Sequence, residues 1–544
     1  MEDKADVRVP VLVVGGSLVG LSTSLFLSRL GVRHLLVEKH SGTSPHPRGR
    51  GINARTMELF RTAGAEGAIR QAAAVLEGVQ GILQAQSLTS GDRNWLIKEI
   101  DPSGALRRFS PTGWCLCSQN NIEPVLTAQS RSQGAEVRFS TELMSFDQDD
   151  TGVTALVKNR ETGEHSTVRC DFLIAADGPR SPVREQLRIP QTGSGELFHN
   201  VSVTFRSERL IEVLGDLRFI VCYLMRPGAD GALLPVDNNK QWVFHAPWHP
   251  ENGETLEDFT DERCVEQIRN AIGAPDLDVE IGGKAPWHAA ERVAQRYSTG
   301  RRVFLVGDAA HEMSPTGAFG SNTGIQDGHN LAWKIAAVLD GSAGMELLDT
   351  YESERLPVAK ATSARASARS AEHSHPGYAP PPTMGGGPGS GVLPTAMGYC
   401  YPDGAVVGGV PGRAIIPDAL QLTGDTGTRS PHMWLTRAGE RISTLDLYER
   451  SFVLLSGTGT PWGEAAERAA ERLSARLDAY TVGSGPGADL VQEDGADWAE
   501  AHGLTVEGAV LVRPDGFVAW RSEGAVADPE SALFDVLSTV LRRA

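Results

Sequence analysis

Residues 307–324 read Gly-Asp-Ala-Ala-His-Glu-Met-Ser-Pro-Thr-Gly-Ala-Phe-Gly-Ser-Asn-Thr-Gly. The apolar residues 303–306 before this stretch predict a buried strand, and residues 324–339 predict a helix after it. A strand that ends in a carboxylate, followed by a glycine-rich loop and a helix N-terminus, presents an acidic group and backbone N–H donors to a polar ligand. The stretch therefore predicts a ligand site in an α/β fold, with Asp308 as its acidic group.

The N-terminal segment has the pattern of a strand–helix–strand unit. Residues 11–14 predict a strand, residues 15–20 read Gly-Gly-Ser-Leu-Val-Gly, and residues 21–30 predict a helix that Gly31 would end. The next predicted strand, residues 34–37, ends in Glu38. Such a turn binds a pyrophosphate, and such a carboxylate holds a ribose hydroxyl. The pattern predicts a dinucleotide site, although Ser17 replaces the second glycine of the motif; the alternative is an ordinary βαβ unit.

A third strand end carries a similar signal. The apolar run at residues 171–176 predicts a strand buried on both faces, and Asp177-Gly178 follows it as a tight turn. Open α/β sheets bind their ligands at the carboxyl ends of strands. We therefore predict that Asp177 and Gly178 belong to the same site, the alternative being a plain turn with a surface ion pair.

The region between residues 188 and 284 differs in its pattern of apolar residues. Residues 201–205 and 242–244 alternate as half-buried strands do. The region is rich in aromatic residues, whereas the whole chain is only 6% aromatic. A sheet with one aromatic face can cover a flat apolar ligand, although core packing explains most such rings. The candidate substrate contacts among the aromatic residues are Tyr223, Phe219, Trp242, Phe244 and, just beyond, Trp287.

The composition argues against several classes of protein. The formal charge of −17 argues against a nucleic-acid or anionic-membrane binder. No apolar stretch approaches the roughly 20 residues of a membrane-spanning helix, and the N-terminus lacks a signal-peptide pattern. The six cysteines have no metal-ligand spacing, which predicts reduced, buried thiols in a cytoplasmic protein without a metal site.

Taken together, these motifs resemble the single-component FAD-dependent aromatic hydroxylases, which include phenol hydroxylases and the aromatic-polyketide hydroxylases of antibiotic pathways. The resemblance implies a Rossmann-like FAD-binding domain of the glutathione-reductase type, interleaved with a mixed β-sheet substrate domain. It implies non-covalent FAD, NADPH or NADH as a transient cosubstrate, and O₂. The implied chemistry is transfer of OH from a hydroperoxide at flavin C4a to an electron-rich ring of a small-molecule aromatic substrate.

The resemblance also implies which residues contact FAD. Glu38 would bind the adenosine ribose, Arg48 a phosphate or the isoalloxazine, Gln119 the phosphates, and Asp308 the ribityl and ribose region. The implied FAD contacts are Gly15, Gly16, Ser17, Leu18, Val19, Gly20, Glu38, Lys39, Arg48, Gln119, Asp177, Gly178, Gly307, Asp308, Pro315, Gly317, Gly320, Ser321, Asn322 and Thr323.

The sequence departs from the family pattern at two positions, and one of them bears on the class of substrate. Phenol hydroxylases carry an aspartate beside the flavin that helps to deprotonate the phenol, and Arg50 stands at that position here. An arginine is no general base at neutral pH, so a bulkier, polyketide-type substrate is favoured. We predict that Arg50 stabilises charge beside the flavin; the alternative is a salt bridge at the domain seam. Ala318 also replaces a usual glycine.

The resemblance implies a division into domains. The FAD-binding domain would comprise residues 1–75, 110–187 and 285–372, and the substrate domain residues 76–109 and 188–284. Residues 373–393 would form a linker to a thioredoxin-like domain at 394–544. That domain holds only Cys400, so a structural or oligomerisation role is expected rather than thiol chemistry, in a monomer or homodimer.

Three functions are compatible with these observations. The leading prediction is hydroxylation of a bulky phenolic natural product. A second is Baeyer–Villiger insertion or epoxidation on a similar substrate, which Arg50 would favour by stabilising an oxyanion. A third is a non-catalytic flavoprotein that binds an aromatic ligand, with which the Ser17 and Ser314 departures are consistent.

Overall fold

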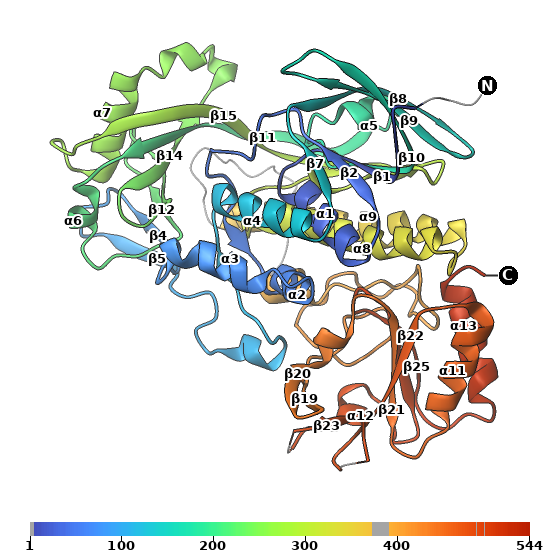
Figure 1. Cartoon of the computed structure of the whole chain (residues 1–544). Coiled ribbons are helices and arrows are strands. Elements are labelled where there is room, and N and C mark those ends of the chain that lie inside the picture. The colour runs from blue at the N-terminus through green and yellow to red at the C-terminus, as the bar shows by residue number, and fades with distance from the viewer. Residues whose placement is uncertain (1–4, 373–390, 486, 494, 544) are drawn as a thin grey trace.

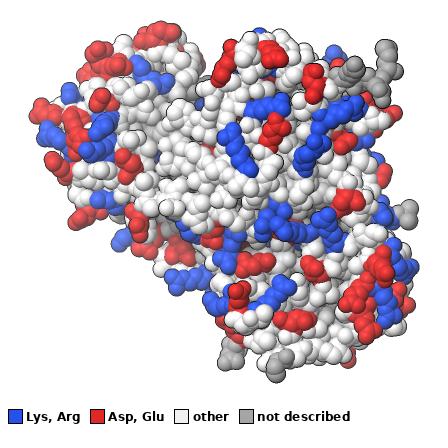
Figure 2. Space-filling model, viewed as in Figure 1, with Lys and Arg blue, Asp and Glu red and all other residues white. Residues whose placement is uncertain are grey.

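The computed structural model describes residues 5–372, 391–485, 487–493 and 495–543, so most of the predicted linker lies outside the described residues. Three large sheets organise these residues, each with its own helices (Figure 1). On the face shown in Figure 2, acidic and basic side chains of the described residues are interspersed. Every helix in the described ranges is too short or too polar to cross a membrane.

The first sheet has the strand order β16-β17-β10-β1-β2-β7, with β8 and β9 extending it beside β10. The strands from β17 to β7 in this order are parallel, whereas β16 pairs antiparallel with β17. The carboxyl-terminal halves of its central strands β1 and β10 are apolar and buried, as expected for strands covered on both faces. The strands are β1 (Val7–Val14), β2 (His34–Val37), β7 (Glu136–Arg138), β8 (Thr141–Asp149), β9 (Gly152–Asn159), β10 (His165–Ala175), β16 (Ser298–Thr299) and β17 (Val303–Leu305).

Helices α1, α4 and α8 pack beside one another against this sheet (Figure 1). The helices associated with it are α1 (Leu18–Arg29), α2 (Ala54–Thr62), α3 (Glu66–Ala73), α4 (Gln119–Ser132), α5 (Pro182–Gln186), α8 (Phe319–Leu339) and α9 (Asp349–Glu372). Helix α8 begins five residues before the predicted start at residue 324. Residues 320–323 therefore form the first turn of the helix rather than a loop.

The second sheet has the order β18-β15-β11-β14-β13-β12-β4-β5. Its strands are β4 (Ile82–Ala85), β5 (Arg93–Ile97), β11 (Gln191–Arg206), β12 (Val221–Leu224), β13 (Gly231–Pro235), β14 (Gln241–Trp248), β15 (Glu280–Ala294) and β18 (His311–Glu312). Helices α6 (Leu210–Leu214) and α7 (Asp261–Ile272) bury one of its faces. Strand β15 runs through the predicted boundary at residue 285 and reaches β18 beside the FAD-binding motif.

The third sheet lies in the C-terminal part of the chain and has the order β20-β19-β23-β22-β21-β24-β25. Its strands are β19 (Trp434–Arg437), β20 (Glu440–Ser443), β21 (Phe452–Gly457), β22 (Leu477–Gly483), β23 (Leu490–Gln492), β24 (Ala509–Val512) and β25 (Val518–Ser522). The helices in this part of the chain are α10 (Val392–Met397), which packs against α2, and α11 (Trp462–Leu473), α12 (Trp498–Ala501) and α13 (Pro529–Val540). Together they form an α/β unit, which we call the C-terminal unit (residues 391–543).

A short ladder completes the architecture near the first sheet. Strands β3 (Gly51–Ile52) and β6 (Cys115–Leu116) pair antiparallel and lead into α2 and α4. All six cysteines are buried and unpaired.

Candidate functional site

The register of the first sheet brings the three predicted strand ends together. Val14 at the end of β1 pairs with Val37 of β2 and with Ala175 of β10, and Ala175 pairs with Leu305 of β17. All these strands are parallel, so the residues that follow them lie along one edge of the sheet. The predicted ligand groups Gly15, Glu38, Asp177 and Asp308 therefore share one edge although up to 293 positions separate them (308 − 15).

Close packing explains the glycines in the turn after β1. Gly15 has a φ of +106°, and a Cβ there would lie 2.2 Å from the carbonyl oxygen of Ala176. A Cβ on Gly20 would lie 1.9 Å from the carbonyl oxygen of Gly15. The Gly16 N–H donates to Glu38 Oε2 at 2.7 Å, which fixes the carboxylate against the turn. The turn therefore exposes backbone N–H groups at the start of α1, where an anion binds well.

Ser17 belongs to a polar group that ties α4 to this turn. Its hydroxyl donates to Glu123 Oε1 at 2.8 Å, and Gln119 Nε2 donates to Ser17 Oγ at 2.8 Å. The backbone N–H of Ser44 donates to Glu123 Oε2 at 2.9 Å. Sequence reasoning missed Glu123, which is 1% exposed. Its position four residues after Gln119, on the same helix face, was the signal that could have identified it.

The remaining predicted residues of this turn lie at its rim. Leu18 and Val19 are partly buried in the first turn of α1, and Lys39 is exposed beside Glu38. Their proximity to the turn follows from the fold, and their contact with FAD stays a prediction.

Asp177 carries a buried oxygen that no described residue satisfies. Its Oδ2 accepts a hydrogen bond from the Val183 N–H at 3.1 Å, whereas its Oδ1 is buried without a partner in the described structure. Burial raises the pKa of this carboxyl, and the hydrogen bonds from Ser181 and Val183 act in the opposite direction. A buried acceptor without a donor is costly, so the site suits a ligand that brings hydroxyl or N–H donors, as FAD does.

Arg48 and Asp308 lie near each other although 260 positions separate them in sequence (308 − 48). Both side chains reach solvent. Neighbouring protein atoms nonetheless raise the pKa of the Asp308 carboxyl by desolvation, and the nearby positive charge of Arg48 acts against this rise. Gly307 precedes Asp308 with a φ of +61°, and a Cβ there would lie 2.8 Å from Val19 Cγ2. The turn after β17 therefore packs directly on α1.

The N-terminus of α8 faces the segment that carries Arg48 and Arg50. Asn322 donates from Nδ2 to Gly51 O at 2.9 Å and accepts from the Asn53 N–H at 3.0 Å. The residues before the helix, Pro315 and Gly317, turn the chain, and Ala318 caps the helix in a left-handed conformation. Gly320, Ser321 and Thr323 follow in the first turn. The N–H groups of Gly320 and Ser321 have no partner within the helix.

Arg50 is buried and reaches the second sheet. Its Nη1 donates to the carbonyl oxygen of Pro235, at the end of β13. Burial lowers the pKa of the guanidinium to about 10, and no carboxylate in the described residues forms an ion pair with it. Instead of the salt bridge that the alternative prediction placed at the domain seam, Arg50 forms a hydrogen bond to a carbonyl oxygen there. No carboxylate compensates its positive charge in the described structure.

The second sheet separates the five predicted substrate contacts onto two faces. Phe219, Trp242 and Phe244 pack in the core that α7 closes. Tyr223 pairs with Ala232, and Ala232 with His245, so these three share a face of the sheet. Trp287 lies against His245 on that same face, with ring centroids 5.3 Å apart. Tyr223 and Trp287 are thus brought to one face, while packing gives the other three the ordinary role of core residues.

Sequence reasoning missed three members of a polar chain on this face, His46, Ser202 and His245, whereas it named the fourth, Trp287. Trp287 Nε1 donates to His245 Nδ1 at 3.2 Å, and Ser202 Oγ lies 3.1 Å from the same nitrogen. His46 Nε2 lies 3.0 Å from Ser202 Oγ and so joins the chain to the segment before Arg48. Burial, and then the charge of Arg48, lower the pKa of His46. The four residues come from four segments, and no local motif in the sequence marks them.

The described ranges contain no group of three or more histidine, cysteine or acidic residues arranged to hold a metal ion. His311 is fully buried and contacts Asp327 at 2.8 Å, which gives it a structural partner rather than an open site.

Comparisons with known proteins agree with this geometry. A family model described as "FAD binding domain" matches residues 8–366, and one described as "Aromatic-ring hydroxylase, C-terminal" matches residues 423–544. A putative polyketide hydroxylase of Streptomyces halstedii is 65% identical over 98% of this chain and 97% of its own length. An aklavinone 12-hydroxylase of Streptomyces purpurascens is 40% identical over 99% of this chain and 100% of its own. The solved structure of aklavinone-11 hydroxylase with FAD and aklavinone has a TM-score of 0.88 and 39% identity, covering 99% of this chain and 100% of that one.

Proposed function

We propose that this chain, which belongs to the family of FAD-binding aromatic-ring hydroxylases, hydroxylates an electron-rich ring of a polycyclic, polyketide-type phenol. It is a flavin-dependent monooxygenase. The observation that carries the proposal is the alignment of the strand ends at Gly15, Asp177 and Asp308 along one sheet edge. Bound FAD supplies oxygen activation; the protein's residues bind it, orient the substrate and exclude water.

The FAD contacts that we propose follow the edge of the first sheet. The turn at Gly15–Gly20, supported by Gln119, holds the pyrophosphate at the start of α1, and Glu38 with Lys39 lies at the ribose. Asp177 and Asp308 accept hydrogen bonds from FAD hydroxyl or N–H groups. Arg48 and the first turn of α8 direct positive potential at the end of the cofactor that gains negative charge on reduction.

The substrate contacts that we propose lie on the face of the second sheet that carries Tyr223. Tyr223 and Trp287 offer an apolar ring surface with polar tips, which suits a flat phenolic ligand. His245 and Ser202 place hydrogen-bonding groups beside them. We assign Phe219, Trp242 and Phe244 to the core behind this face, where they hold the sheet in shape.

We propose the domain division that the sequence implies, with a FAD-binding part, a substrate part and a C-terminal part. We propose that NADPH or NADH reaches the cofactor transiently from the surface of the FAD-binding part, because no second glycine-rich βαβ unit is evident in the sequence. The state as monomer or homodimer stays a prediction.

Ligand-stimulated consumption of the nicotinamide tests the proposal. The purified protein should be yellow, and acid precipitation should release all flavin as FAD, because no residue is expected to bind it covalently. Oxidation of NADPH or NADH should rise sharply with anthracyclinones and related polycyclic phenols, and the product should gain one oxygen atom. A protein that binds such ligands without stimulated oxidation would contradict the proposal.

A second candidate reaction is Baeyer–Villiger insertion or epoxidation on the same substrate class. The buried positive charge of Arg50, which has no carboxylate partner in the described structure, favours it because such a charge stabilises an oxyanion. Isotope-labelled O₂ and product structure distinguish the reactions: ring hydroxylation leaves the carbon skeleton intact, whereas insertion produces an ester or a lactone.

A further inference from the structure

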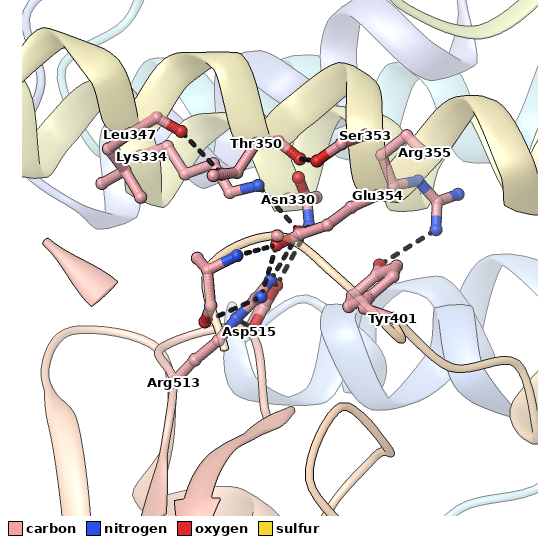
Figure 3. A network of polar contacts seen from close by, with 12 residues as sticks. Asn330, Lys334, Leu347, Thr350, Ser353, Glu354, Arg355, Tyr401, Arg513 and Asp515 are labelled. Carbon is pink, nitrogen blue, oxygen red and sulfur yellow. Dashed lines mark hydrogen bonds and ion pairs between the residues drawn. The ribbon is translucent and has the colours of Figure 1, made fainter. Parts of the chain in front are cut away.

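The C-terminal unit contacts α8 and α9 through a buried ionic network (Figure 3). Glu354 of α9 accepts hydrogen bonds from Arg513 through both oxygens, at 2.7 and 2.9 Å. Its Oε2 also accepts from Lys334 Nζ of α8 at 2.7 Å. We call this set the seam network; its members are Asn330, Lys334, Glu354, Arg355, Tyr401, Arg513 and Asp515. All of them are buried.

Each carboxylate of the seam network is paired with a buried cation, which makes this contact tight. Burial opposes ionisation of Glu354, but Arg513 and Lys334 outweigh it and hold the pKa of that carboxyl far below its ordinary value. Asp515 similarly keeps a lowered pKa because Arg513 lies against it. Removing one partner of such a buried pair leaves an uncompensated buried charge and is strongly destabilising. The C-terminal unit is thus held firmly on α9.

Arg355, the next residue of α9, extends this contact to the FAD site. Its Nη1 donates to Tyr401 Oη at 3.1 Å, and its Nη2 donates to Thr323 O, in the first turn of α8, at 3.1 Å. Its Nε donates to Asp327 Oδ1 at 2.7 Å. Asp327 Oδ2 in turn accepts from the Gly307 N–H at 3.2 Å. A continuous chain of bonds therefore runs from Tyr401 to the turn that presents Asp308.

A second set of contacts holds the opposite wall of the site. Arg429 of the C-terminal unit binds both carboxylate oxygens of Glu58 in α2. Arg55 donates to Glu58 Oε2 at 3.1 Å and to the carbonyl oxygen of Asp515 at 2.6 Å. Helix α2 directly follows the segment that carries Arg48 and Arg50. The C-terminal unit thus contacts the supports of both segments that flank the proposed FAD ring site.

We propose that the C-terminal unit is a positioning part of the FAD site, in which Tyr401 acts through Arg355 and Asp327 on the Gly307 turn and on the first turn of α8. The inference rests on the flavin site proposed above. A turn fixed before the ligand arrives binds it more tightly than one that must be ordered on binding. By reciprocity, FAD must stabilise the contact between the C-terminal unit and α9 to the same extent.

A single hydroxyl deletion tests the proposal. Tyr401→Phe removes the oxygen that accepts from Arg355 and keeps the ring packed on Phe517. We expect the FAD dissociation constant of the full chain, measured by flavin fluorescence titration after reversible removal of FAD, to rise roughly fivefold or more. Tyr399→Phe is the matched control, because this neighbouring buried tyrosine packs on the same ring and no hydrogen bond joins it to Arg355 in the described contacts.

Folding and site effects are separated by a parallel urea titration of the FAD-free proteins. Weaker FAD binding by Tyr401→Phe at an unfolding midpoint matching that of Tyr399→Phe supports the proposal. An unchanged dissociation constant overturns it, as does equal weakening in both variants. If Tyr401→Phe has no effect, Asp308→Ala shows which proposal has failed. Unchanged FAD binding by Asp308→Ala would mean that the proposed FAD site is wrong. Weakened FAD binding by Asp308→Ala would mean that only the positioning role of the C-terminal unit is refuted.

Hydrogen exchange on the wild-type chain decides the question even if Tyr401→Phe does not fold. FAD should slow amide exchange in residues 399–405 and 513–518, while exchange in β22, in the middle of the third sheet, should not change. Absence of protection at the seam would overturn the proposal.

Discussion

Ala318 holds a backbone conformation that glycine adopts more easily than alanine. Its φ is +55°, in the left-handed region, where a Cβ costs about 1–2 kcal/mol. Ala318→Gly should therefore raise the free energy of unfolding by roughly 0.5–1 kcal/mol, after the greater freedom of glycine in the unfolded chain is subtracted. Urea unfolding of the FAD-free protein measures this. Ala74→Gly is the control: Ala74 has a φ of −57° and is exposed, so glycine there should destabilise.

Arg50 provides a second prediction at the scale of a residue. If its buried charge acts beside the flavin, Arg50→Ala should retain FAD but lower the reduction potential of the bound flavin. It should also lower the yield of oxygenated product per nicotinamide oxidised, by about tenfold or more, with H₂O₂ released instead. Coupling efficiency and potentiometric titration measure the effect.

The contrasting outcome for Arg50 is equally defined. The hydrogen bond to Pro235 O gives this residue a role in holding β13 near the FAD-binding part. If that is its only role, Arg50→Ala should lower the urea midpoint while wild-type coupling and potential persist.

Local sequence patterns predicted those site residues that directly follow a predicted strand. Gly15, Glu38, Asp177 and Asp308 each follow an apolar run, so their positions could be predicted once the strands were placed. His245 and Asp327 lie inside a strand and a helix, so neither follows a strand end that would mark it as a ligand group. Their partners come from distant segments, which the sequence alone does not bring together.

At the scale of elements, glycines set how closely α1 and α8 approach. A Cβ on Gly328 would lie 2.2 Å from Thr23 Oγ1, and one on Gly324 would lie 2.6 Å from Gly307 Cα. Both helices begin at the FAD site, so their spacing determines where their N-termini point. The start of α8 could not be read from the sequence because it depends on Ala318 adopting a left-handed cap, which its residue type disfavours.

Gly328→Ala tests this close packing. Overpacking costs about 1–3 kcal/mol, whereas alanine gains roughly 1 kcal/mol over glycine in helix propensity, so we expect a net loss of stability of up to about 2 kcal/mol. FAD affinity should fall with it. Gly67→Ala in α3 is the matched control, because no heavy atom lies within 4 Å of a Cβ there, and it should stabilise the protein. Two equally stabilised variants would show that α1 and α8 can move apart without cost.

At the scale of the whole molecule, the sequence indicated separate units but gave no information about their contacts. The pairs Arg513–Glu354 and Arg429–Glu58 join residues 159 and 371 positions apart. Each arginine and glutamate has many possible partners in a chain with 51 basic and 68 acidic residues. Only the packing of the C-terminal unit on α2, α8 and α9 selects these partners. The charged content of the sequence is ordinary and does not reveal that some of these residues form buried ion pairs.

Glu449, which contacts Arg29 of α1, should make the stability of the protein depend on pH. It lies in the C-terminal unit, 6% exposed, with Oε2 3.2 Å from Arg29 Nε at the end of α1 and with a buried Oε1 that has no partner in the described structure. Burial outweighs the attraction of Arg29 and raises the pKa of this carboxyl to about 7. Between pH 4.5, its ordinary value, and about 7, the folded protein therefore keeps a proton that the unfolded chain has released. Stability from this group is greatest at low pH and falls as the pH rises through that window.

Glu449→Gln should remove this loss because the amide carries no charge to bury. The difference in unfolding free energy, variant minus wild type, should increase between pH 5 and 8 by up to roughly 3 kcal/mol, and taking the difference cancels the titration of all other groups. Urea unfolding across that range measures it. Glu464→Gln is the control, since Glu464 is exposed and pairs with Arg468 one helical turn away, so its difference should stay nearly constant. A flat profile for Glu449→Gln as well would mean that the Glu449 carboxylate is ionised in the folded protein throughout, with Arg29 compensating its burial.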